Sequence, residues 1–113
     1  MKLLSTAVLV AALALAQPPA PKNLKLLPAD ENLIPTMRSF TVALGVKCNF
    51  CHNMKDFASD EKEEKGFARH MISMAKEING NFHDGKVHVT CYTCHRGATE
   101  PATVPPEATK SGQ

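Results

Sequence analysis

Residues 89–97 read VTCYTCHRG, in which two residues separate two cysteines and a histidine directly follows the second cysteine. Residues 46–54 repeat this pattern as VKCNFCHNM. The two copies of C-x-x-C-H contain all 4 cysteines of the 113-residue chain. The sequence therefore concentrates its cysteine chemistry in one motif that occurs twice.

Several kinds of site use the C-x-x-C spacing. A thioredoxin-like redox pair belongs in a strand–helix–strand context, which this sequence lacks, and a four-cysteine zinc site usually places its pairs about 15–20 residues apart. Disulfides remain open from the cysteine count, but they give the histidines no role. Covalent haem attachment uses every residue, because two thiols bond one porphyrin and the histidine ligates its iron. We therefore predict two c-type haems, attached through Cys48, Cys51, Cys91 and Cys94 and ligated by His52 and His95.

A stripe of apolar residues at helical spacing precedes each motif. Both stripes follow the pattern i, i+4, i+7, i+11, which is typical of an amphipathic helix. The first consists of Leu33, Met37, Phe40 and Leu44, and the second of Phe67, Met71, Met74 and Ile78. Asp30 or Asn32 could cap the first helix, and Gly45 and Asn79-Gly80 are suitable helix ends.

A methionine occupies the second position of both stripes. A thioether is a suitable sixth ligand for a haem iron whose other axial ligand is histidine. The matching positions in the repeat make Met37 and Met71 the predicted distal ligands. The alternative is ordinary core packing, which is the usual role of methionine on an apolar stripe and our interpretation of Met74. Met54 follows the first histidine too closely to reach the opposite haem face, so we assign it to loop packing.

Three histidines lie outside the motifs. His70 is next to Met71 but off the apolar stripe, so we expect it to face solvent. His83 and His88 lie in the loop before the second motif. They are either solvated loop residues or ligands for the iron of another haem.

The ends of the sequence have a different composition from its centre. Residues 1–16, MKLLSTAVLVAALALA, resemble a signal peptide that is cleaved after export, since the apolar run is shorter than the roughly 20 residues of a membrane span. Retention of this segment as a membrane anchor is the alternative. We predict a Pro-rich extended leader at 17–28, a dihaem domain at 29–98 and a flexible tail at 99–113.

The composition limits both the partners and the core. A formal net charge of +2 is too small to indicate nucleic-acid binding. A short chain with 5% aromatic residues can bury little apolar surface by itself. We therefore predict a mostly α-helical fold, in which two helix–turn–C-x-x-C-H repeats pack around two haems.

The segment MRSFTVALGVKCNFCHNMKDFASDEKEEKGFARHMISMAKEING, followed by VTCYTCHRG, resembles the photosynthetic reaction-centre cytochrome c subunit family. The resemblance extends from about Asn23 to Gly97. It implies a repeated helix, turn and attachment motif in which the helix methionine is the sixth ligand, pairing Met37 with His52 and Met71 with His95. The large subunit of that family carries four haems in two related halves, and this chain corresponds to one half.

These observations predict an exported, periplasmic one-electron carrier between redox partner proteins rather than an enzyme. One alternative is a homo-oligomeric haem array in which His83 or His88 reaches the iron of a neighbouring copy. The other is a small haem peroxidase or reductase with His70 or His83 as a polar distal group. A methionine for each iron argues against the enzyme, because six-coordination disfavours substrate binding.

Overall fold

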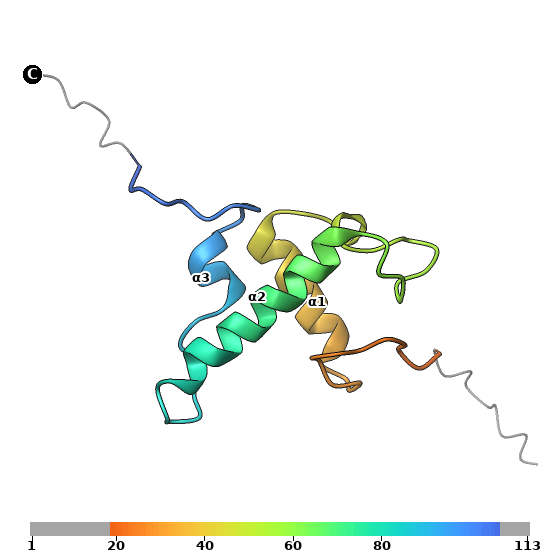
Figure 1. Ribbon diagram of the computed structural model, residues 1–113, viewed down its shortest axis with the longest axis horizontal. Coiled ribbons are helices and arrows are strands. Elements are labelled where there is room, and N and C mark those ends of the chain that lie inside the picture. Colours follow the sequence, from red (N-terminus) through yellow and green to blue (C-terminus); the bar gives the residue numbers. More distant parts are fainter. Residues whose placement is uncertain (1–18, 107–113) are drawn as a thin grey trace, which may run out of the picture.

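The computed structural model describes residues 19–106. They form helix α1 (Leu33–Leu44), the 3₁₀ turn η1 (Cys48–Phe50), helix α2 (Glu63–Gly80) and the short helix α3 (Cys91–His95), as Figure 1 shows. No strand occurs in this range, so the prediction of a mostly helical chain is confirmed. None of these helices is long and apolar enough to cross a membrane. The predicted signal peptide lies outside the described residues, as does the end of the predicted tail.

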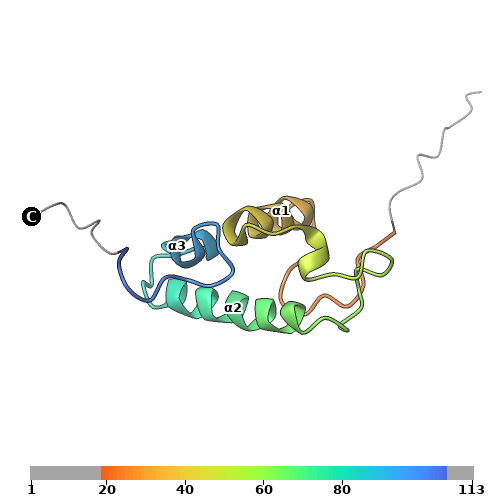
Figure 2. The same cartoon turned by 90° about the horizontal axis from the view of Figure 1, so that it is seen from above.

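The helices form two layers. Figure 2 shows α1 and α3 side by side in one layer and α2 in the other. Helix α3 packs against α1 and also contacts α2. The motif helix of the second repeat therefore lies against the amphipathic helix of the first repeat, and the two halves of the sequence form one unit.

A close backbone contact fixes the junction between the repeats. Helix α1 ends at Gly45, which adopts the left-handed conformation (φ 66°) that glycine tolerates best. The Gly97 N–H donates a 2.8 Å hydrogen bond to the Ala43 carbonyl oxygen. A Cβ atom on Gly45 would overlap the Gly97 carbonyl oxygen and lie 3.0 Å from its carbon. The C-terminal glycine predicted for the first helix is thus confirmed, and it has a second role in tertiary packing.

The two long helices begin and end near the predicted residues, with one correction at the start of α1. Asn32 occupies the N-cap position of α1, but its side chain makes no capping hydrogen bond. Asp30 instead shapes the preceding turn, where its carboxylate accepts the Asn32 N–H at 2.9 Å. Helix α2 ends at Gly80 as predicted, yet the next residue, Asn81, continues in right-handed geometry (φ −68°). The predicted end at Asn79-Gly80 is therefore confirmed, and it does not use a left-handed residue.

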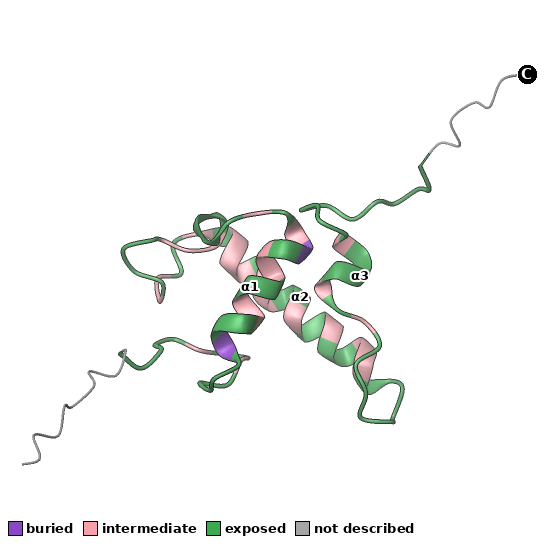
Figure 3. Ribbon diagram, turned by 180° about the vertical axis from the view of Figure 1, so that it is seen from behind, coloured by how far each residue is buried: buried purple, intermediate pink, exposed green. Residues whose placement is uncertain are grey.

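The described residues bury very little apolar surface. Only Leu33 and Ala43 are buried among them, as the few purple segments in Figure 3 show. The apolar stripe of α2 is largely open, with Phe67 60% exposed and Met71 43% exposed. Helices normally cover such a stripe against a core, and large exposed apolar surfaces mark binding sites. The two predicted amphipathic helices exist, but protein side chains alone do not cover the apolar face of α2.

Candidate functional site

The first C-x-x-C-H motif forms a tight 3₁₀ turn directly after α1. The N–H groups of Cys51 and His52 donate to the Cys48 carbonyl oxygen at 3.3 and 3.0 Å. The Cys48 side chain is exposed and that of Cys51 is half-buried. Burial raises the pKa of the Cys51 thiol, and the nearby Glu64 carboxylate adds to this shift. The turn therefore holds two thiols and the following histidine in one short segment.

The second motif is helical from its first residue to its last. The Thr90 N–H donates to Thr93 Oγ1 at 2.9 Å and so starts α3, while Arg96 ends the helix in left-handed geometry (φ 52°). Residues three apart on a helix lie on the same side, which brings Cys91 and Cys94 together. Burial raises the pKa of the Cys91 thiol, whereas Cys94 is exposed.

All four thiols are free in the structure. Within residues 19–106, no three His, Cys, Asp or Glu side chains gather closely enough to hold a metal ion by themselves. Each motif instead presents one exposed and one half-buried thiol.

Both motif histidines are oriented in the same way. His52 Nδ1 lies 2.9 Å from the Phe57 carbonyl oxygen, and His95 Nδ1 lies 2.9 Å from the Ala98 carbonyl oxygen. A carbonyl oxygen can only accept, so Nδ1 carries the proton and Nε2 keeps its lone pair. Histidines that bind metals typically have this arrangement, because the second hydrogen bond fixes the ring and its tautomer. The geometry therefore prepares Nε2 of both residues for an iron.

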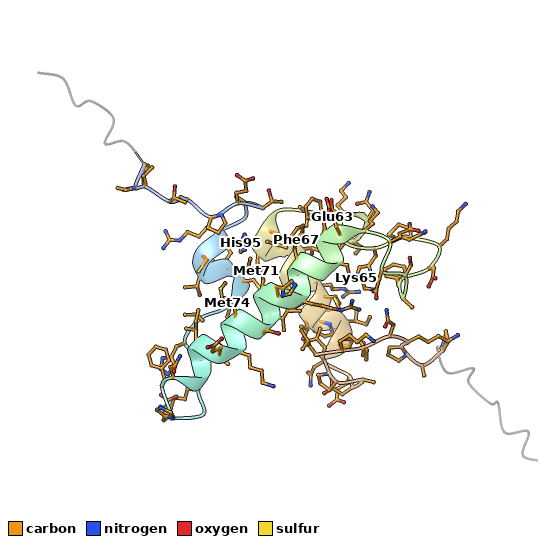
Figure 4. All side chains as sticks on the ribbon, viewed as in Figure 1. Glu63, Lys65, Phe67, Met71, Met74 and His95 are labelled. Atoms are coloured by element: carbon orange, nitrogen blue, oxygen red, sulfur yellow. The ribbon has the colours of Figure 1, made fainter. Side chains whose placement is uncertain are left out.

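The two predicted methionine ligands lie on different helices, Met37 on α1 and Met71 on α2. Met37 is half-buried on α1. Figure 4 shows Phe67, Met71 and Met74 along one side of α2, with His95 on the neighbouring α3. Met71 and Met74 have similar exposed fractions, 43% and 47%. Exposure therefore does not separate the predicted ligand from the predicted packing residue, and that assignment rests on the repeat.

A shallow hollow of about 510 Å³ that is largely open to solvent adjoins the first motif. Its lining residues come from the end of α1, from η1 and from the loop that follows: Thr41, Val46, Lys47, Cys48, Asn49 and Met54. Met54, predicted to pack within its loop, thus lines the same hollow as Cys48. The thiol pairs, the Nε2 atoms and the open apolar face of α2 are groups that could hold a covalently attached porphyrin.

The remaining histidines are not arranged like the motif histidines. His70 is exposed on α2, as predicted for a residue off the apolar stripe. His88 Nε2 lies 2.8 Å from an Asp84 carboxylate oxygen, and its ring stacks on Phe82 with centroids 3.8 Å apart. Hydrogen bonds from the Lys86 N–H and then from His88 lower the pKa of Asp84. His83 is exposed and has left-handed backbone geometry (φ 54°).

Asn79 positions the second motif, a role that the sequence interpretation missed. Its Oδ1 accepts the N–H groups of His88 and Val89 at 2.8 and 2.9 Å, and its Nδ2 donates to the Val89 carbonyl oxygen at 2.9 Å. The side chain therefore closes the 80–88 loop immediately before Thr90 and Cys91. An asparagine near a helix end usually indicates only a boundary, which concealed this function.

A charged network supports the loop after the first motif. Asp60 forms ion pairs with Lys65 at 3.2 Å and Arg69 at 3.1 Å. Hydrogen bonding from Asn23 and then Lys65 lowers the pKa of Asp60 to about 2. Arg69 also donates to the Asn23 carbonyl oxygen at 3.2 Å, and Asn23 Nδ2 donates to the Ala58 carbonyl oxygen at 2.8 Å. The loop is thereby tied both to α2 and to the N-terminal segment.

Comparisons of the sequence with known proteins find related cytochromes. The chain is 42% identical over 62 residues to cytochrome c-554 of Chloroflexus aurantiacus, covering 50% of this chain and 15% of that protein. It is 39% identical over 59 residues to the photosynthetic reaction center cytochrome c subunit of Rubrivivax gelatinosus (50% and 16%). For the subunit of the same name from Roseobacter denitrificans, identity is 35% over 86 residues (66% and 23%).

The matched segments therefore span less than a quarter of the length of these relatives. The match to the family described as photosynthetic reaction centre cytochrome C subunit is much wider, because it covers residues 14–112. That range includes both C-x-x-C-H motifs and both amphipathic helices. The chain belongs to the photosynthetic reaction-centre cytochrome c subunit family.

Proposed function

We propose that this chain is an exported dihaem c-type cytochrome that carries one electron at a time between redox partner proteins. The observation that carries the proposal is a repeated geometry. Each C-x-x-C-H motif has a pair of free thiols and a histidine whose Nδ1 faces a backbone carbonyl oxygen at 2.9 Å. A single such motif would suffice for one haem, and its repetition supports two.

The proposed roles divide into attachment, ligation and shielding. The thiols of Cys48, Cys51, Cys91 and Cys94 would attach the haems, Nε2 of His52 and His95 would hold the irons, and the sulfur atoms of Met37 and Met71 would be the second protein ligands. When bound, each haem supplies a one-electron iron couple. The apolar stripes on α1 and α2 would keep water from the porphyrin faces. Ligation by the methionine sulfur, rather than by a second histidine, would raise the reduction potential.

Location and partners follow from the family and from the first residues of the sequence. Export would place the chain in the periplasm of a bacterium, where haem-maturation machinery attaches c-type haems. Two relatives are named as reaction-centre subunits, which supports a membrane-bound redox protein as one partner. The other partner would be a soluble donor or acceptor.

A redox titration of the haem-loaded protein with optical and near-infrared readout tests the proposed function. Two one-electron steps are expected, together with the weak near-infrared band of sulfur-to-iron charge transfer in the oxidised protein. Met37→His should remove one haem's share of that band and lower its potential, because imidazole donates more strongly to ferric iron. Rapid binding of carbon monoxide or cyanide by the unmodified protein would instead indicate an open iron and an enzyme.

A matched control tests the register of the second methionine. Met74→Leu is a change of similar volume on the same stripe of α2, and it should cost less than about 1.5 kcal/mol. It should leave both haem spectra unchanged, whereas Met71→Leu should alter one of them. If Met74→Leu alters a haem spectrum, then Met74 is the ligand and Met71 is the packing residue.

A further inference from the structure

Each motif histidine is oriented by a backbone carbonyl oxygen, and within the described part of the chain only one of these two oxygens accepts a second hydrogen bond. The Phe57 carbonyl oxygen accepts His52 Nδ1–H at 2.9 Å and also the Lys65 ammonium at 2.9 Å. The Ala98 carbonyl oxygen accepts His95 Nδ1–H, and among residues 19–106 no second donor reaches it. The histidine arrangement is therefore the same in both motifs, but within this range only the first motif has an ammonium group on the orienting carbonyl.

The Lys65 ammonium is held in a single position. Its side chain is only 12% exposed, and Nζ also donates to the Ser59 carbonyl oxygen at 2.8 Å and pairs with Asp60 at 3.2 Å. Its three N–H donors thus have three partners. In Figure 4, Lys65 lies on the side of α2 opposite Phe67 and Met71, away from the proposed haem-facing stripe. Its contact with the first motif therefore runs through the Phe57 carbonyl group.

This contact weakens electron donation by His52. Two donors share one carbonyl oxygen, and the ammonium charge repels the positive end of the Nδ1–H bond. A weaker hydrogen bond at Nδ1 leaves the imidazole less anionic, and a less basic imidazole stabilises ferric iron less. The ammonium also disfavours the additional positive charge of the oxidised site, with little screening because it is mostly buried. Both effects raise the reduction potential at the first motif.

We propose that Lys65 is a positioning residue that makes the site of Cys48, Cys51 and His52 the higher-potential one. The inference rests on the proposed dihaem function. The first electron to enter the protein is then held at the first motif, and the second motif acts as the lower-potential relay. Asp60 opposes this effect, because its carboxylate partly neutralises the Lys65 charge at 3.2 Å.

Potentiometric titration of the haem-loaded protein tests this proposal with two variants that act in opposite directions. Lys65→Met removes the cation and should lower the higher of the two midpoints, leaving the lower one in place. We expect the equilibrium constant for reduction of that haem to fall about tenfold, which is 59 mV for a one-electron couple. Asp60→Asn keeps Lys65 and removes its neutralising partner, so it should raise the higher midpoint.

Lys55→Met is the matched control. Lys55 lies in the same loop and carries the same charge, but its ammonium has no hydrogen bond or ion pair among the described residues. Its loss should move the higher midpoint clearly less than the loss of Lys65 does. Lys65→Arg keeps the charge and the donors, so its higher midpoint should lie close to that of the unmodified protein. A proton NMR readout on the reduced protein adds a local test, since the His52 Nδ1–H signal should move downfield in Lys65→Met while that of His95 stays.

The outcomes separate this inference from the proposed function. Suppose that the unmodified protein shows two midpoints. The role of Lys65 is overturned, and the dihaem carrier left intact, if Lys65→Met moves neither midpoint or only the lower one. The same holds if Lys65→Met moves the higher midpoint no more than Lys55→Met does. Absence of two one-electron steps in the unmodified protein would overturn both. If Lys65→Met does not load haem, Asp60→Asn decides, because an unchanged or lowered higher midpoint contradicts the proposal.

Discussion

Gly45→Ala should destabilise this protein more than a left-handed glycine alone would explain. The substitution places a methyl group against the Gly97 backbone, where it would overlap the carbonyl oxygen. The junction between α1 and the segment after α3 must then open, and the 2.8 Å hydrogen bond from Gly97 N–H to the Ala43 carbonyl is strained or lost. The damage should therefore extend from the first repeat to the second.

Gly85→Ala is a close control for the backbone cost. Gly85 has φ 69° against 66° for Gly45, and no atom lies within 4 Å of where its Cβ would be. The left-handed conformation of alanine costs about 1–2 kcal/mol in both variants. Gly45→Ala adds the lost hydrogen bond and the unsatisfied groups it leaves, which are worth about 1–3 kcal/mol. We expect an excess of about 2 kcal/mol for Gly45→Ala over Gly85→Ala.

Guanidinium unfolding of the haem-loaded variants, followed by circular dichroism, measures this difference. The m-value should be unchanged if only the native state is affected. Equal destabilisation by the two substitutions would refute the close contact between Gly45 and Gly97. The structure would then be wrong at the junction that joins the two repeats.

Asn79→Ala should cost about 2–3 kcal/mol of unfolding free energy in denaturant, because it removes three hydrogen bonds to residues 88 and 89. The control Asn81→Ala removes one exposed hydrogen bond to the Glu77 carbonyl oxygen and should cost less than about 1 kcal/mol. Equal costs would show that Asn79 does not hold the loop. The ionised Asp60 should contribute stability that is present above its ordinary pKa of 3.8 and is lost as the pH falls through about 2. Between these pH values, the melting temperature of Asp60→Asn should therefore fall less steeply than that of the unmodified protein. Parallel melting curves would contradict the lowered pKa. His83→Ala with His88→Ala should leave the molecular mass in light scattering and both haem spectra unchanged, because His88 Nε2 is already engaged by Asp84 at 2.8 Å. A smaller mass in the double variant than in the unmodified protein would favour the haem array instead.

The features that the sequence predicted well are those that depend on residue type and spacing. The apolar stripes of α1 and α2 occur at helical period, and only glycine suits the left-handed end of α1. Covalent attachment requires two cysteines at a fixed spacing, so Cys91 and Cys94 are recognisable without a structure. The same holds for the histidine that follows them.

The features that the sequence could not predict depend on backbone groups. Every residue has a carbonyl oxygen, so nothing in the residue types of Phe57 or Ala98 indicates that they orient His52 and His95. The contact of Lys65 with Phe57 depends on how the charged loop folds back onto α2. The side-chain cap expected at Asn32 also failed, because Asp30 forms the competing turn at 2.9 Å.

The exposure of the α2 stripe shows why the core could not be predicted from side chains alone. A stripe containing Phe67, Met71 and Met74 would normally pack against another helix. Here α2 has its apolar side chains largely open, at 43–60% exposure. We interpret this face as the surface for a large planar cofactor. Such a cofactor would contribute to the core, but the amino-acid sequence does not include it.

The intact mass of the mature protein, made with haem-maturation machinery, tests the central claim most directly. Each motif has both thiols and a histidine with its Nε2 free, so the mass should exceed that of the polypeptide by two covalently bound haems. Replacing Cys91 and Cys94 by serine should remove one haem and leave the other. A mass that corresponds to one haem or none in the unmodified protein would contradict the dihaem account.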